Sequence, residues 1–239
     1  RGAMEIIARI HNDFPTRFAV PRQSGLVAAE SVIVFEKPYR VPEALRGLEG
    51  YSHIWLLWSF HELKRDTWEP TVRPPRLGGN TRVGVFATRS PYRPNPIGLS
   101  SVELVRVEES GEMGHVLIVS GADLMDCTTI LDIKPYLPYT DAHPEARSGF
   151  ARSVMDRRLQ VHVPDEAMRK VPETKRTPLL ELLAQDPRPG YHDDPERIYG
   201  FGYAGLEIRF SVCQDELTVT EIEEMSEHGG KTHGDAGTA

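Results

Sequence analysis

Three segments of the chain concentrate polar side chains that glycines and prolines punctuate: 12–26, 76–100 and 123–136. The third segment contains the consecutive residues Asp126, Cys127, Thr128 and Thr129. A carboxylate can accept the proton that a nitrogen or oxygen nucleophile releases, and a turn of small polar residues can bind a ligand through its backbone. Such residues rarely fill a hydrophobic core, so the three segments predict a ligand site built on loops.

The glycines of 200–205 match the GxGxxG spacing of dinucleotide-binding loops. The residues that follow, 206–210, alternate apolar and polar side chains as a strand does, whereas a phosphate-binding loop leads into a helix. The context therefore favours a glycine-rich bend that enters a strand over a nucleotide site.

Nine histidines invite a metal hypothesis, yet none stands in an HxH, HExxH or Cys/His pattern with the spacing of metal ligands. His53 and His61 flank the apolar run 54–60, where a backbone hydrogen bond can satisfy each ring. We therefore expect no dedicated metal site.

The formal net charge of −7 argues against a nucleic-acid partner, because phosphate contacts supply much of the affinity for RNA. The span from Pro70 to Val102, however, carries five arginines and no acidic residue. A globally acidic protein can present a locally cationic face to RNA. The alternative is an ordinary solvated loop that is rich in arginine.

Strands are the main elements available to position these segments in the first half of the chain. Alternation and β-branched residues predict strands at 4–10, 31–36, 53–60, 82–87, 100–107, 115–120 and 130–133. Short strands at this spacing are typical of a barrel. One short connecting helix is expected at 42–50, between a proline and a glycine. The fold class is therefore mainly β, with a closed β-barrel domain over 4–144.

Beyond residue 144 the pattern becomes a mixture of helices and strands. Capping residues and apolar spacing predict helices at 165–170 and 177–185 and strands at 206–212 and 217–222. We expect a small α+β C-terminal domain over 145–224. The remaining segment, 225–239, has no apolar period, and we expect it to be a disordered tail.

Composition limits the class of protein. Hydrophobic residues make up 39% of the chain and charged residues 26%, the balance of a globular protein with a core. No apolar run approaches the roughly 18 residues that span a bilayer, and no signal-peptide pattern opens the sequence. Two cysteines without CxxC spacing fit a reducing compartment. We expect a cytoplasmic protein without a membrane partner.

Two long motifs resemble a known family. Residues 84–98 read GVFATRSPYRPNPIG and residues 126–136 read DCTTILDIKPY. They are similar to the GVFATRSxxRPNPIG and D(G/C)TP(V/L)LDIKPY signatures of the TsaA-like tRNA (adenine-N6)-methyltransferases. The resemblance covers 4–141, and 186–191 resembles the DPRPxY motif in the C-terminal domain of bacterial members. Cys127 stands where bacterial relatives commonly have glycine, and Thr129 where they have proline, which leaves the local backbone geometry open.

The resemblance implies a β-barrel methyltransferase that works as a homodimer, with S-adenosyl-L-methionine (SAM) as methyl donor and no metal. The substrate that it implies is N6-threonylcarbamoyladenosine at position 37 of tRNA. By similarity, the residues expected to bind SAM are Asn12, Asp13, Phe14, Ser52, His53, Arg89, Leu99, Cys127, Thr128, Thr129 and Ile130. Arg89 has the charge to bind the carboxylate of SAM, although it can equally be an ordinary loop arginine. For Cys127 we favour a small buried side chain over a nucleophile.

Methyl transfer to N6 needs positioning and proton removal, because the lone pair of that nitrogen is delocalised. Asp126 is the expected proton acceptor, and Asn95 the residue that holds the N–H. A turn-capping role is the alternative for Asp126. Asp132 is a second candidate for the proton, and its alternative is an ion pair with Lys134.

RNA-binding proteins read unstacked bases in single strands and hold phosphates with cations. Arg22, Arg93 and Lys134 have the charge for phosphate contacts, and Tyr136 has the ring for stacking. Each of these residues is equally compatible with a scaffold role.

Two other functions are compatible with a SAM-binding barrel. One is a non-catalytic SAM-responsive RNA-binding or regulatory protein, and the intact motif loops favour catalysis over it. The other is an enzyme that uses SAM for halide or hydroxide chemistry. The arginine-rich loop and the C-terminal domain oppose that interpretation.

Overall fold

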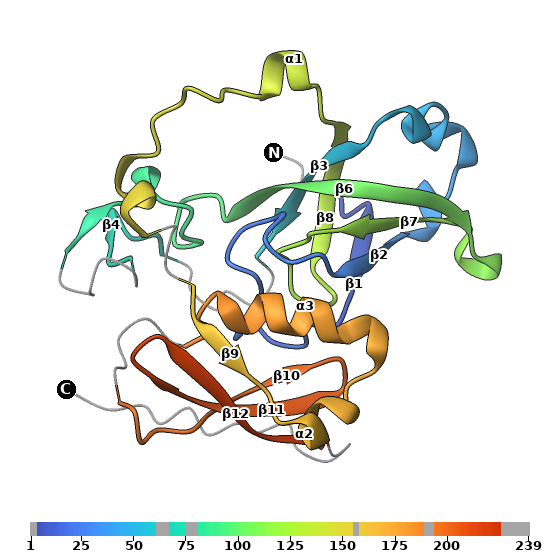
Figure 1. Ribbon diagram of the computed structural model, residues 1–239. Helices are drawn as coiled ribbons and strands as arrows, with labels where there is room; N and C mark the ends of the chain where they lie inside the picture. Colours follow the sequence, from blue (N-terminus) through green and yellow to red (C-terminus); the bar gives the residue numbers. More distant parts are fainter. Residues whose placement is uncertain (1–3, 61–66, 75–80, 155–157, 189–193, 226–239) are drawn as a thin grey trace.

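Antiparallel strands close into a barrel in the N-terminal half of the chain (Figure 1). The computed structural model describes residues 4–60, 67–74, 81–154, 158–188 and 194–225. Around the barrel the strands follow the order β1 (Ala8–His11), β2 (Glu30–Phe35), β7 (His115–Ser120), β6 (Ile97–Glu109), β3 (His53–Ser59) and β8 (Thr129–Pro135). Inward-facing Ile10, Ile33, Ile54 and Leu56 have no exposed surface and form part of its core. The predicted closed β-barrel is confirmed.

The strand predicted at 82–87 is wrong. The strand β5 covers only Val83–Gly84, pairs with β4 (Thr71–Val72), and gives way to the 3-10 turn η5 (Val85–Ala87). The hydroxyl and the amide of Thr88 both donate to the carbonyl of Val85, at 2.9 and 3.1 Å. A threonine side chain that binds a nearby carbonyl in this way competes with strand pairing.

The single helix predicted at 42–50 is also wrong. The segment forms two 3-10 turns, η2 (Pro42–Leu45) and η3 (Leu48–Gly50), after a first one, η1 (Lys37–Tyr39). Gly47 separates η2 from η3 with a φ of 87°, in the left-handed region. That conformation is accessible to glycine and interrupts a right-handed helix.

The C-terminal domain, residues 159–225, contains a four-stranded sheet with helices packed against it. The strand order is β10 (Tyr199–Tyr203), β11 (Leu206–Cys213), β12 (Glu216–Glu224) and β9 (Gln160–His162), and β9 runs parallel to β12. The helices are α2 (Asp165–Arg169) and α3 (Glu173–Ala184). The predicted small α+β fold is confirmed, although β9 and β10 were not predicted.

The GxGxxG segment is a β-hairpin. Its first residues belong to β10, and Ala204 and Gly205, with φ of 50° and 74°, make the two-residue turn into β11. Two consecutive left-handed residues give the twist that a tight hairpin needs. The rejection of a nucleotide-binding loop is confirmed by this geometry.

Helix α3 begins four residues before the predicted start at Thr177. Pro178 is therefore inside the helix, where it removes one backbone hydrogen bond. Leu179, Leu182 and Leu183 are buried in the core of the C-terminal domain. Tertiary burial outweighs the local signal that proline gives for a helix start.

The connection between β1 and β2, residues 12–29, leaves the barrel and packs into the core of the C-terminal domain. Phe14, Ala19, Val27 and Ala29 are buried in that core. Helix α3 lies between the barrel and the C-terminal sheet (Figure 1), and its Glu181 carboxylate accepts the amide of Ala28 at 2.8 Å. The β1–β2 connection therefore joins the two domains.

The remaining elements are short, namely α1 (Pro138–Asp141), η6 (Gly111–Met113) and η7 (Gly149–Val154). No helix in the described ranges has both the length and the apolar character needed to cross a membrane. Of the tail predicted at 225–239, Met225 donates its amide to the carbonyl of Gly205, and 226–239 lie outside the described residues.

We predict that Gly98→Ala destabilises the barrel. A Cβ at residue 98 would lie 2.1 Å from Cε2 of Trp58, its buried partner across the β3–β6 pair. Overpacking of this kind costs about 1–3 kcal/mol, so urea denaturation should show a lower midpoint. Gly84→Ala is the matched control, because a Cβ there meets no atom within 4 Å. Equal midpoints for the two variants would contradict this packing.

Candidate active site

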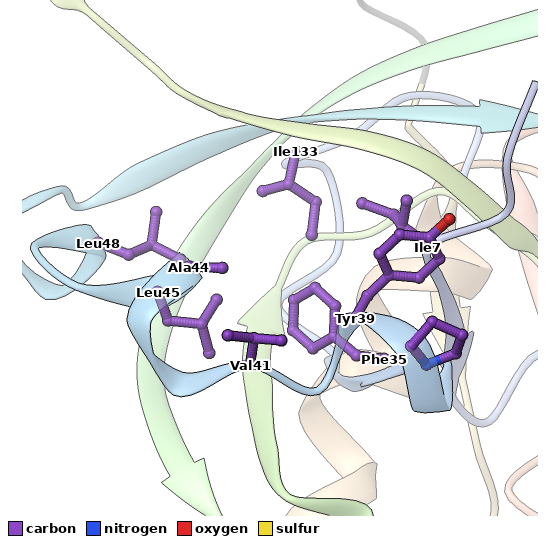
Figure 2. Close-up of a pocket in the computed structure, with 9 residues that line it drawn as sticks. Ile7, Phe35, Tyr39, Val41, Ala44, Leu45, Leu48 and Ile133 are labelled. Atoms are coloured by element: carbon purple, nitrogen blue, oxygen red, sulfur yellow. The ribbon is translucent and has the colours of Figure 1, made fainter.

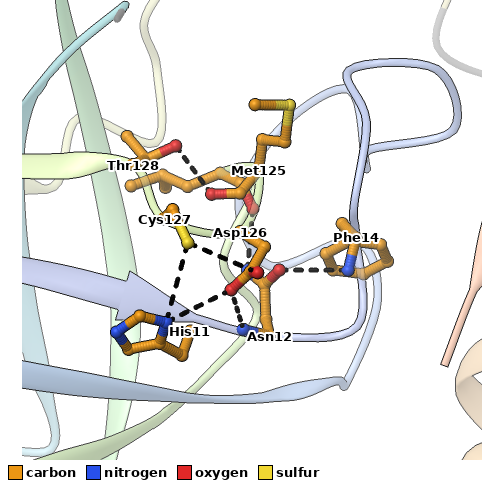
Figure 3. Close-up of polar contacts among 8 residues, drawn as sticks. His11, Asn12, Phe14, Met125, Asp126, Cys127 and Thr128 are labelled. Carbon is orange, nitrogen blue, oxygen red and sulfur yellow. Dashed lines mark hydrogen bonds and ion pairs between the residues drawn. The ribbon is translucent and has the colours of Figure 1, made fainter. Parts of the chain in front are cut away.

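The turn that precedes β8 is held by hydrogen bonds to β1 and to the β1–β2 connection (Figure 3). The amide of Asp126 donates to the carbonyl of Phe14, and that of Cys127 to the carbonyl of Ile10, both at 2.8 Å. The amide and the hydroxyl of Thr128 donate to the carbonyl of Met125. Because these amides are already engaged, ligand contacts from the turn fall to its side chains and carbonyl oxygens.

Asn12 fastens the turn to the end of β1. Its Nδ2 donates to the carbonyl of Leu124 at 2.8 Å, its Oδ1 accepts the amide of Phe14 at 3.0 Å, and its own amide donates to Oδ1 of Asp126 at 3.1 Å. The structure thus places Asn12 and Asp126 together, as predicted for the site. The side-chain amide of Asn12 also holds the turn in place through Leu124 and Phe14, a structural role that the sequence did not indicate.

His11 joins Asp126 and Cys127 in a cluster that the sequence analysis missed. The Nδ1 atom of His11 lies 3.4 Å from Oδ1 of Asp126 and 3.9 Å from Sγ of Cys127, and Sγ lies 3.5 Å from Oδ2 of Asp126 (Figure 3). The alternation of β1 carries the signal, because Ala8 and Ile10 are buried and His11 therefore points outward.

The thiol of Cys127 is not activated as a nucleophile. Partial loss of hydration and the neighbouring Asp126 carboxylate raise the pKa of the Cys127 thiol. The thiolate is the reactive form, and a raised pKa reduces its population at neutral pH. This electrostatic setting agrees with a role for Cys127 other than that of a nucleophile. The expectation that its side chain is buried is wrong, because Cys127 is exposed on the turn.

A second polar chain links the barrel interior to the arginine-rich loop. The indole Nε1 of Trp58 donates to Oγ of Ser100 at 3.0 Å, and that hydroxyl donates to Oδ1 of Asp123 at 2.5 Å. Burial raises the pKa of the Asp123 carboxyl, while the Ser100 hydrogen bond and the charge of Arg89 oppose the rise. Arg89 also donates to Oε1 of Gln23 at 2.5 Å. Residues of all three predicted segments therefore meet here.

The residues expected to bind SAM divide between two ends of the barrel. In the β3–β8 pair, Ser59 faces Thr129 at one end and Ile54 faces Pro135 at the other. Five residues of strand separate these ends, which is about 17 Å at ~3.3 Å per residue. The turn at 126–129 belongs to the first end, and the Ser52–His53 pair to the second.

Several other expected cofactor residues are engaged within the protein. Asp13 forms an ion pair with Lys175, and the Phe14 ring is buried with its centroid 6.0 Å from that of Tyr203. Thr128, Thr129 and Ile130 are buried at the start of β8. Leu99, in contrast, is 54% exposed on β6 and leaves an apolar surface open.

The expected RNA-binding residues are spread over the molecule. Arg22 donates to the carbonyl of Asp186, and Arg93 donates to two carbonyls of its own loop, each at 3.0 Å. Lys134 pairs with Asp132 at 3.0 Å, as the alternative for Asp132 anticipated.

Tyr136 and Asn95 occupy different surroundings. The ring of Tyr136 lies against Trp55 and His53, with centroid distances of 5.4 and 6.2 Å. Asn95 is exposed, and its carbonyl accepts the amide of Ile97 at 2.8 Å. The structure therefore places the two residues expected to be catalytic, Asp126 and Asn95, in separate loops.

An exposed aromatic pair in the 67–98 region was not anticipated. The rings of Trp68 and Phe86 are stacked with centroids 6.1 Å apart, and the two residues are 48% and 73% exposed. Aromatic rings open to solvent are platforms on which a nucleic-acid base can stack.

Comparison with known families identifies both domains. Residues 9–142 match the tRNA-methyltransferase O N-terminal domain, and residues 156–225 match the TrmO C-terminal domain. The chain belongs to the tRNA-methyltransferase O family. The family resemblance drawn from the two sequence motifs is thereby confirmed.

Relatives of this tRNA-methyltransferase O chain include named enzymes. It is 41% identical over 228 residues to the tRNA (adenine(37)-N6)-methyltransferase of Escherichia coli, with 92% of this chain and 97% of the relative covered. It is 37% identical over 133 residues to a probable S-adenosyl-L-methionine-binding protein of Methanothermobacter thermautotrophicus, with 56% and 88% covered. A crystal structure of TrmO from Pseudomonas aeruginosa superposes with a TM-score of 0.73 at 35% identity, covering 93% of this chain and 99% of that one.

A groove of about 260 Å³ lies away from the 126–129 turn of this tRNA-methyltransferase O domain (Figure 2). Its walls are formed almost wholly by apolar side chains: Ile7, Phe35, Pro38, Tyr39, Val41, Ala44, Leu45, Leu48 and Ile133. Among the described residues no carboxylate or cation lines it, so they do not supply the charged groups that a zwitterionic ligand requires.

We predict that Asp123→Asn changes the pH dependence of stability. Because the pKa of Asp123 is raised on folding, the native state keeps a proton that the unfolded chain loses near pH 3.9. The contribution of Asp123 to the free energy of unfolding of the wild type therefore falls as pH rises above this value, and the asparagine removes that contribution. Urea denaturation at a series of pH values from about 3.9 upward should show Asp123→Asn gaining stability relative to wild type as pH rises. Parallel pH curves for the two proteins would rule out this burial effect.

Proposed function

We propose that the protein transfers a methyl group from SAM to N6 of threonylcarbamoyladenosine at position 37 of tRNA. The observation that carries the proposal is the meeting of all three polar segments beside the barrel of a tRNA-methyltransferase O domain, where Ser100 donates to Asp123 and Arg89 donates to Gln23. The names of the relatives support the donor and the modified position.

Residues of these segments fit the chemistry of SAM. The exposed Leu99 offers an apolar wall for an adenine ring, and the Arg89 guanidinium is suited to a carboxylate. The Asp126 carboxylate, 34% exposed, can face a ribose hydroxyl or a positive charge. When bound, SAM supplies an electrophilic methyl group.

We infer that Asp126 accepts the proton of N6. Its Oδ1 is held by the Asn12 amide, and the backbone of Asp126 is held by Phe14, so the carboxylate has a fixed orientation. Pre-oriented groups lower the cost of reaching the transition state. His11, 3.4 Å away, is suited to pass the proton on to solvent.

The arginine-rich loop and its aromatic pair are suited to hold the RNA. Arg82 and Arg89 lie on the same loop as the exposed Trp68–Phe86 pair. Cations and a stacking surface together match a phosphate backbone with an unstacked base. Arg93 contributes indirectly, because its guanidinium holds the loop in shape.

A homodimer can bring the two groups of expected SAM ligands to one site. Ser52 and His53 are at the far end of β3 from the 126–129 turn, so one protomer does not bring both to the same ligand. Two copies related by a two-fold axis can bring the Ser52–His53 end of one barrel to the 126–129 end of its partner. We therefore propose that each site is shared between two protomers.

We predict that Asp126→Asn lowers the single-turnover rate of methyl transfer by about 10²-fold or more, the range for a lost acid–base group. The asparagine keeps the acceptor for the Asn12 amide, so SAM affinity measured by calorimetry should change much less. The rate is followed by mass spectrometry of tRNA nucleosides. If SAM binding is lost while the rate at saturating SAM is preserved, Asp126 is a ligand or a turn cap and not the base.

We predict that co-expressed His53→Ala and Asp126→Asn subunits complement each other. In a mixed dimer with shared sites, one site carries both defects and the other carries none. A random mixture should therefore recover about a quarter of the wild-type rate, although each variant alone is nearly inactive. The rate of the purified mixture checks this. No recovery, or full activity of His53→Ala alone, would contradict a shared site.

A further inference from the structure

The His11–Asp126–Cys127 cluster combines three side chains of different classes that all bind transition metals. Imidazole, carboxylate and thiolate are the ligand types of protein zinc sites, with bonds of about 2.0–2.3 Å. In a tetrahedron with such bonds the ligand atoms are roughly 3.3–3.7 Å apart. In the cluster, His11 Nδ1 lies 3.4 Å from Oδ1 of Asp126, Cys127 Sγ lies 3.5 Å from Oδ2 of the same carboxylate, and Nδ1 and Sγ are 3.9 Å apart. One ligand atom from each residue lies within 4.8 Å of the other two, so the three side chains are close enough together to bind one ion.

Backbone hydrogen bonds order the residues of this cluster. Cys127 has a φ of 64°, and its amide is bound to Ile10 on the strand that carries His11. The amide of Asp126 is bound to Phe14, and its Oδ1 to the amide of Asn12. A site whose ligands are already ordered loses less entropy when it binds an ion.

The cluster is open to solvent. The side chains of His11 and Asp126 are 47% and 34% exposed, and Cys127 is a free, exposed cysteine. An ion can enter from water, and water can complete its coordination. It is the one group of three such ligands found among the described residues.

We propose that His11, Asp126 and Cys127 form a binding site for Zn²⁺ or a similar thiophilic divalent cation. Binding releases the thiol proton of Cys127 to solvent and occupies the Asp126 carboxylate. If Asp126 accepts the N6 proton, as in the proposed function, an occupied site blocks methyl transfer, and this inhibitory role rests on that function. The binding of the cation does not.

Binding is tested with Co²⁺ as a spectroscopic probe on full-length protein freed of metal with a chelator. We expect one equivalent of Co²⁺ to produce thiolate-to-cobalt charge-transfer absorption, and added Zn²⁺ to remove it. Cys127→Gly, which suits the left-handed φ and keeps the turn folded, should abolish the band. His11→Gln should weaken binding by more than about tenfold.

Cys213→Ser is the matched control, because Cys213 is also free and exposed but lies at the end of β11. Its absorption band should equal that of the wild type. A band that survives in Cys127→Gly, or is lost in Cys213→Ser, would overturn the site, and so would the absence of any band in the wild type.

Inhibition is tested separately by titrating Zn²⁺ into the methylation assay, with each variant compared with its own rate without zinc. Wild type and Cys213→Ser should lose activity, and Cys127→Gly should retain most of its own rate. Equal inhibition of all three would overturn the inhibitory role. A lack of methylation in metal-free wild type would instead contradict the proposed function, so the two failures are distinguishable.

Discussion

The burial of Phe14 in the core of the C-terminal domain is the constraint on which the geometry of the site depends. Its side chain packs beside Tyr203, while its carbonyl accepts the amide of Asp126 and its amide donates to Asn12. One residue therefore ties the turn before β8 to a core that belongs to the other domain. The C-terminal domain contributes to the site through this connection, because buried aromatic packing fixes a backbone position more firmly than a surface loop can.

Three arginines of the acid-free span, Arg82, Arg89 and Arg93, interact with other groups of the protein itself. Arg93 binds two carbonyls of its own loop, and Arg82 binds the side chain and carbonyl of Thr71. The charge of Arg89 opposes the rise in the pKa of Asp123 that burial causes. A count of cations in the sequence therefore overstates the charge that remains for RNA, since carbonyls of the loop engage Arg82 and Arg93, and the Asp123 carboxylate outside the span interacts with Arg89.

The barrel strands and the family could be predicted from the sequence, because alternation and long motifs determine them. Barrel strands such as β3, with alternate residues buried, follow from the period of two, and the family follows from the two motifs. Two predicted elements were wrong because local interactions outweighed the pattern. The Thr88 hydroxyl binds the carbonyl of Val85 and ends the predicted strand, and the left-handed φ of Gly47 divides the predicted helix. His11 was missed because its partners are 115 and 116 positions away, and only the closing of the barrel brings them together.

The left-handed conformation of Cys127 shows that the backbone of the turn does not depend on the side chain of this residue. A residue with a Cβ at this φ costs roughly 1–2 kcal/mol relative to a relaxed conformation. The amides of Asp126, Cys127 and Thr128 are each satisfied by a carbonyl, and each such bond contributes about 0.5–1.5 kcal/mol. These bonds offset the strain, so the neighbours impose the turn whatever side chain occupies its centre. A thiol can therefore stand beside His11 and Asp126 with the backbone that glycine would adopt, and the chemistry of this surface can change while the fold does not.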